Sequence, residues 1–78
     1  MNAEVKELYM RNHIKALAEA NHKAAKIMER MGGGFASALA VAYFRADLDN
    51  QARILGAFPE LFERYRRMAR ELAETTET

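Results

Sequence analysis

The stretch Gly32-Gly33-Gly34-Phe35-Ala36-Ser37-Ala38-Leu39-Ala40-Val41-Ala42-Tyr43-Phe44 decides the fold of this chain. Its three glycines can end a helix, and we expect one of them to take the left-handed backbone conformation that closes helices. The ten residues that follow carry no charge and are rich in alanine and large apolar side chains. A helix of this composition has to be covered on most sides, and the segments before and after it are the available cover.

The segment before the glycines, residues 3–31, contains no glycine or proline and is dominated by good helix formers. A single helix over these residues would be about 43 Å long. A compact domain of this size has a radius of gyration near 12 Å. The helix must therefore either bend or break, with Asn21 as the candidate position, or extend beyond the rest of the fold. We favour a helix that extends and packs on a second copy of the chain.

One line of apolar residues supports this choice. From Ala3 to Met31, five residues recur at a seven-residue spacing, and two of them are alanine. This spacing is typical of helices that pair along their length, and the alanines indicate close rather than strongly hydrophobic packing. We therefore predict a homodimer. Its seam is predicted to consist of Met10, Ile14, Leu17, Ala24, Ile27 and Met31.

Three shorter helices are predicted after the glycines. Asp47 and the polar residues next to it can cap a helix start, because their side chains accept hydrogen bonds from free backbone amides. Pro59 suits the first turn of a helix, where its missing N–H would have no partner in any case. The predicted helices run from 34 to 46, from the cap at 47–50 to 57, and from 59 to 73.

The chain is predicted to be one all-α domain, a small helical bundle. Residues 1–31 form the long helix, 32–73 the compact helical part, and 74–78 a tail that frays. With 78 residues and no cysteine, the chain has no disulfide framework and no thiolate metal site. Core packing or self-association must supply its stability, because a chain of this length buries only a modest core.

Charge and hydropathy exclude several classes of protein. Twelve basic residues nearly balance eleven acidic ones, which gives no strong electrostatic preference for nucleic acid or a membrane surface. The longest weakly polar run, residues 35–44, is far shorter than the roughly 18 residues of a membrane span. The first residues include Glu4 and Glu7 and lack the pattern of a secretory signal. We expect a cytoplasmic protein with no membrane partner.

The last predicted helix carries the densest basic cluster of the chain. Its arginines could bind phosphates, so a small nucleic-acid-binding accessory or regulatory protein is the alternative reading. Acidic residues at pairing distance along the same helix favour an ordinary solvated face instead. Tyrosine and arginine together are also enriched at protein interfaces. The candidate partner-binding residues are Arg64, Tyr65, Arg66, Arg67 and Arg70.

No group of residues indicates catalysis. Ser37 is the only serine, and no base is positioned beside it by the sequence. The three glycines lack the lysine and hydroxyl residue of a nucleotide-binding loop. Glu19 and His22 form one Glu-x-x-His pair without the further carboxylates that a metal site of that kind requires. We expect no catalytic, cofactor-binding or metal-binding residue, and a protein that is not an enzyme.

About half of the chain resembles small uncharacterised proteins encoded by tailed phages and prophages. The resemblance covers residues 32–68 and is carried by the glycine run with the alanine-rich stretch after it, by Arg45-Ala46-Asp47 and Asn50, and by the segment from Ala57 to Tyr65. It implies a phage accessory protein in the host cytoplasm that binds and redirects or inhibits a host protein. The resemblance supplies no catalytic residue. The function expected is a non-enzymatic interaction module, an inhibitor or adaptor used in host takeover.

Overall fold

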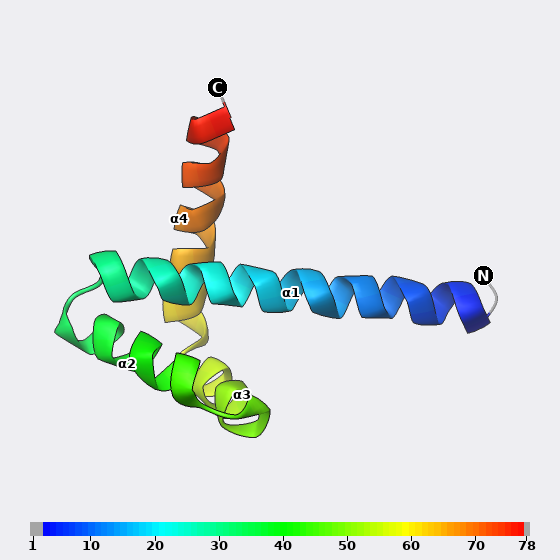
Figure 1. The fold of residues 1–78 in the computed structure, drawn as a ribbon, viewed down its shortest axis with the longest axis horizontal. Coiled ribbons are helices and arrows are strands. Elements are labelled where there is room, and N and C mark those ends of the chain that lie inside the picture. The colour runs from blue at the N-terminus through cyan, green and yellow to red at the C-terminus, as the bar shows by residue number, and fades with distance from the viewer. Residues whose placement is uncertain (1–2, 78) are drawn as a thin grey trace.

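The computed structural model describes residues 3–77, and the side chains of residues 3–75. It contains four helices: α1 (Ala3–Met31), α2 (Gly34–Arg45), α3 (Leu48–Ala57) and α4 (Pro59–Glu77) (Figure 1). The described part of the chain has no strand, so the prediction of an all-α fold is confirmed.

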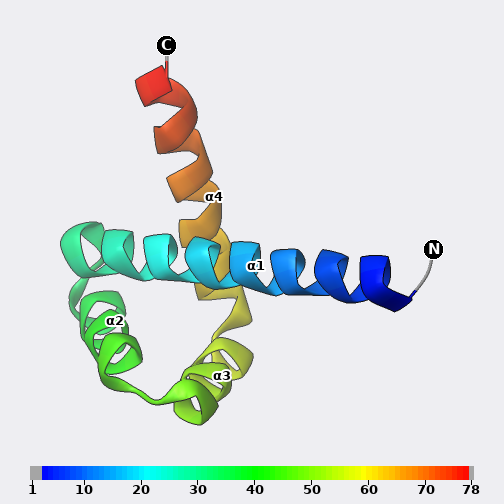
Figure 2. The same ribbon diagram turned by 45° about the vertical axis from the view of Figure 1, so that its right-hand side comes forward.

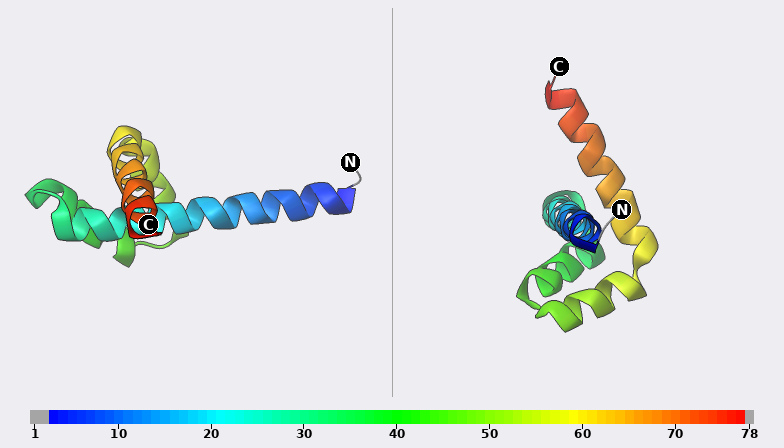
Figure 3. Two further views of the ribbon diagram at one scale, coloured as in Figure 1. Left: turned by 90° about the horizontal axis from the view of Figure 1, so that it is seen from above. Right: turned by 90° about the vertical axis from the view of Figure 1, so that its right-hand side faces the viewer.

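α1 is a continuous helix and runs through Asn21 without a break. α2 and α4 both pack on its C-terminal half, and α3 connects the two (Figure 2). Seen along α1, the three shorter helices form an arc around it (Figure 3, right). The N-terminal half of α1 extends beyond this arc. The radius of gyration is accordingly 14.3 Å, larger than the roughly 12 Å of a compact domain of this length.

The core lies where α1, α2 and α4 meet. Met28 of α1 and Phe62 of α4 are its largest fully buried side chains, and the ring of Tyr43 packs on Phe62 with the ring centroids 5.4 Å apart. Alanines line the facing sides of α1 and α2, which allows the two helices to approach closely. The remaining buried apolar residues are Ala24, Ala25, Ala36, Ala40 and Tyr65.

The turn between α1 and α2 depends on the size of Gly32 and not on its conformational freedom. No glycine of residues 3–77 has a positive φ, so the prediction of a left-handed glycine was wrong. A Cβ atom on Gly32 would instead lie 2.5 Å from the carbonyl oxygen of Met28 and 2.7 Å from Cβ of Ala36. The Ser37 hydroxyl strengthens the turn by donating a hydrogen bond to the carbonyl oxygen of Glu29 at 3.1 Å.

Two helix ends differ from the sequence predictions. α2 ends at Arg45, because Ala46 has an extended backbone that leads directly into the cap of α3. That cap is Asp47, whose carboxylate accepts a hydrogen bond from the backbone N–H of Asn50 at 2.9 Å. α4 continues to Glu77, so the predicted frayed tail is helical over 74–77. No residue after Ala73 breaks the helix. Met1, Asn2 and Thr78, which belong to the predicted long helix and tail, lie outside the described residues.

The crowding at Gly32 predicts a position-specific loss of stability. We expect Gly32→Ala to lower the free energy of unfolding by about 1–3 kcal/mol, since α1, α2 or the Tyr65 hydroxyl 3.3 Å away must shift to make room. Gly34→Ala is the matched control, because a Cβ there meets no atom within 4 Å. Urea unfolding followed by circular dichroism at one protein concentration compares the two. Equal losses would contradict this account of the turn.

Candidate functional site

The N-terminal part of α1 extends beyond the other helices of the fold (Figure 1). We call residues 3–19 the arm, because every one of them is exposed. At 1.5 Å per residue the arm is about 25 Å long. Its large apolar residues Met10, Ile14 and Leu17 are 54%, 62% and 50% exposed. With the smaller Ala3 they form one line, which we call the arm face.

The arm face continues the surface by which α1 packs into its own core. Residues seven apart lie on nearly the same side of a helix. Ile14 and Leu17 are therefore in line with Asn21 and Ala24, which are buried under the other helices. The same apolar side of α1 is covered in its C-terminal half and bare in its N-terminal half. The N-terminal half therefore has the apolar residues of a core-facing side, but no other helix of the described chain buries them.

The predicted dimer seam is divided by this arrangement. Met10, Ile14 and Leu17 lie together on the arm face. Ala24 is fully buried inside the chain and cannot belong to a seam between two copies, and Ile27 is partly buried against the core. Met31 is exposed, but it lies at the opposite end of α1 beside the glycine turn. The seven-residue spacing could not distinguish pairing with α2 and α4 from pairing with a second copy.

A shallow groove of about 200 Å³ runs beside the C-terminal part of the arm. Ile14 and Leu17 form one side of it, Leu48 and Leu55 of α3 the other, and Tyr43 lies at its base. Leu48 is 84% exposed, the highest value among the large apolar side chains of the described chain. Sequence reasoning missed Leu48. The available signal was a leucine placed between two aspartates in the first turn of a helix. Its neighbours along the chain are polar and offer no apolar surface for it to contact.

The basic helix α4 does not present all of its predicted partner-binding residues. Tyr65 is buried in the core, and the Arg66 side chain is only 20% exposed. Arg66 donates hydrogen bonds to the Asn21 side-chain oxygen at 2.8 Å and to the Glu63 carboxylate at 3.0 Å. Tyr65 was wrongly placed on a partner-binding surface, because it is buried, and Arg66 is held by these bonds with only part of its side chain exposed. Arg64, Arg67 and Arg70 are exposed.

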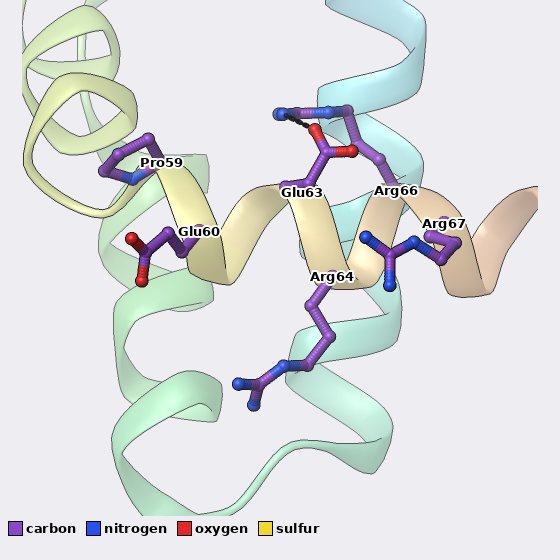
Figure 4. Close-up of a pocket in the computed structure, with 6 residues that line it drawn as sticks. All are labelled: Pro59, Glu60, Glu63, Arg64, Arg66 and Arg67. Atoms are coloured by element: carbon purple, nitrogen blue, oxygen red, sulfur yellow. Dashed lines mark hydrogen bonds and ion pairs between the residues drawn. The ribbon is translucent and has the colours of Figure 1, made fainter.

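The exposed arginines and carboxylates of α4 share one outer surface. Figure 4 shows Arg66 bonded to Glu63, with Arg64 and Arg67 extending from other positions on the helix. The hydrogen bond from Arg66 and the positive charge of the same residue lower the pKa of the Glu63 carboxyl. The stability that the interaction of Glu63 with Arg66 contributes is therefore fully present above the ordinary carboxyl pKa. It is lost as the pH falls through the lowered pKa of Glu63. The Glu63 carboxylate also feels the positive charges of Arg67 and Arg70, which weakens this surface as a phosphate site.

His22, which the sequence offered as one half of a Glu-x-x-His pair, contacts an aromatic residue. The His22 ring packs edge-on against Phe44, with the ring centroids 5.2 Å apart. Within residues 3–77 there is no group of three or more histidine, aspartate or glutamate side chains that could hold a metal ion. None of the described helices is both long enough and apolar enough to cross a membrane.

The link between Arg66 and Asn21 predicts a difference between neighbouring arginines. Arg66→Ala leaves the buried Asn21 amide without its partner, and we expect a loss of about 1–3 kcal/mol in unfolding free energy. Arg67→Ala, on the exposed side of the same helix, should cost less than about 0.5 kcal/mol. Urea unfolding measures both, and Asn21→Ala made alone and with Arg66→Ala should show coupling between the two residues. Equal costs for the two arginines would exclude a structural role for the link.

Comparisons with known proteins leave function to be argued from these surfaces. No protein-family model, curated protein or solved structure matches the chain. The resemblance to phage-encoded proteins therefore stays a prediction from the sequence.

Proposed function

We propose that this protein is a non-enzymatic protein-binding module and that the arm face is its binding surface. The observation that carries the proposal is the continuity of the arm face with the core face of α1. Met10, Ile14 and Leu17 have the residue types and the helical spacing of a packed surface, yet they are about half exposed or more. A partner that covers them gains roughly 25 cal/mol for each Å² of apolar area removed from water.

The small core gives a second reason to expect a partner. Half of the buried apolar residues of the described chain are alanines, and only Met28, Tyr43, Phe62 and Tyr65 are large. More large apolar side chains of the described chain are exposed than buried. A domain built in this way gains stability by covering apolar surface in a complex, because its own core supplies little. Contiguous exposed apolar surface of this kind marks interaction sites.

The class of partner follows from the sequence resemblance. A phage accessory protein of this kind would act on a host protein as an inhibitor or adaptor. Nucleic-acid binding through α4 is the alternative, and it has less support. Arg66 is engaged with Asn21, and acidic residues lie among the remaining arginines, so few positive charges are free for phosphates.

Variants of α1 can test the binding proposal. Ile14→Lys with Leu17→Lys places two charges on the arm face. Leu8→Lys is the matched control, because Leu8 is 57% exposed on the same helix but lies about 200° around it from Met10. Tagged proteins are used to capture partners from a bacterial lysate, with and without nuclease, and the partners are identified by mass spectrometry. We expect one protein to be retained by the wild type and the control and at least tenfold less by the double variant.

Two results would count against this function. Equal recovery with the double variant and with the wild type would show that the arm face is not the binding surface. Recovery that disappears after nuclease treatment, and that depends on Arg64, Arg67 and Arg70, would favour the nucleic-acid alternative instead.

A further inference from the structure

We propose that the arm face is covered by the arm of a second copy of this chain, and that the two arms run antiparallel. This inference rests on the proposed function, because it concerns the same surface: a host protein that binds the arm face would compete with the second copy for it. It goes beyond the predicted seam, because it is restricted to the arm and specifies both orientation and register. Three independent features of the arm carry it: the extent of its bare face, the position of its charges, and the location of the folded part.

The extent of the bare face sets the register. Among the described residues, its bare apolar members run from Ala3 to Leu17, and its covered portion begins at Asn21. Two antiparallel arms overlap over this whole length when Ala3 of one copy lies opposite Asn21 of the other. In that register Ile14 of each copy lies opposite Met10 of its partner. When Glu7 is counted with Ala3, Met10, Ile14 and Leu17, the steps along the face alternate between four and three residues, which is the spacing by which side chains of paired helices interdigitate.

The position of Glu7 favours the antiparallel orientation. Glu7 lies in line with Ile14, on the edge of the arm face, and its carboxylate is bonded to Arg11 of the same helix at 2.7 Å. In a parallel pair the two Glu7 side chains would face each other, and Lys6 would lie near the partner's Arg11. In the antiparallel register Glu7 lies beside the partner's Leu17 and within reach of its Lys15. The two Glu7 carboxylates are thereby separated, and each of the two Arg11 side chains that come to lie near each other keeps the Glu7 carboxylate of its own helix.

The location of the folded part favours the same orientation. α2 and α4 pack on the C-terminal half of α1, and α3 joins them on that side (Figure 1). A parallel pair would bring both folded parts together at one end of the arms. An antiparallel pair places them at opposite ends. The beginning of each arm then passes along the partner's groove, where it can cover Leu17 and the exposed Leu48 of α3.

The oligomeric state is the first test. Sedimentation velocity of the full chain should show a concentration-dependent dimer. Ile14→Lys should weaken dimerisation at least tenfold, and Leu8→Lys should leave it unchanged, because only the first change lies on the arm face. Circular dichroism of the dissociated Ile14→Lys variant should show an unchanged helix content. A wild-type protein that stays monomeric at hundreds of micromolar, or a dimer that Ile14→Lys leaves intact, overturns the proposal.

Cysteine cross-linking tests the orientation and register. The chain has no cysteine, so single substitutions report unambiguously. In the proposed register Glu7 of one copy lies opposite Leu17 of the other. A mixture of Glu7→Cys and Leu17→Cys proteins in a glutathione redox buffer should therefore give mainly the mixed disulfide. Each variant alone should cross-link poorly, because its two cysteines would be about 15 Å apart along the helices. Adding Ile14→Lys to both should abolish the cross-link.

The alternative results are distinguishable. Disulfides between identical variants would indicate a parallel pair and overturn the proposed orientation. A monomeric protein that still captures another protein through Ile14 and Leu17 would overturn self-pairing while leaving the binding function intact. A protein that neither pairs nor captures anything through the arm face would exclude both.

Discussion

The close approach of α1 and α2 at Gly32 is the constraint on which the rest of the structure depends. Atoms of Met28, Ala36 and Tyr65, from three different helices, surround the place where a side chain would be. Because that place is empty, α2 can turn back along α1 within a few residues and pack on it through alanines. α4 then closes the other side by placing Phe62 between them. A larger residue at this turn would force α1, α2 or the Tyr65 side chain to shift.

This way of closing the core determines what is left uncovered. Helices that approach through alanine make a thin core, and α2, α3 and α4 together can cover only one half of α1. The other half keeps its apolar side because the pattern that serves the core continues into the arm without change. Asn21 marks the boundary between the two halves, where a buried amide is satisfied by Arg66 of α4. The fold and the candidate binding surface are therefore two parts of one helix face.

Local signals allowed most of the fold to be predicted from the sequence. Pro59 and the capping carboxylate of Asp47 fix helix starts through their own chemistry, so they required no knowledge of distant contacts. The candidate sites were less predictable, because they depend on which side of a helix is covered. Spacing alone could not show that Ala24 faces α2 and α4, that Tyr65 is buried, or that Arg66 turns toward Asn21. These assignments are set by contacts between segments distant in the sequence; Arg66 and Asn21, for example, are 45 residues apart.

α3, which forms one side of the groove beside the arm, is the least buried helix of the core region. It contributes partly covered side chains such as Ile54 and Leu55 to the edge of the core, but none of its residues is buried. Segments with so few buried contacts open at a lower free energy than the core, which hydrogen exchange detects as early loss of protection. The wall formed by α3 can therefore move while α1 and α4 stay in place. A ligand in the groove would have to order α3. Part of the binding free energy would be used for that ordering, and the measured affinity would be correspondingly lower.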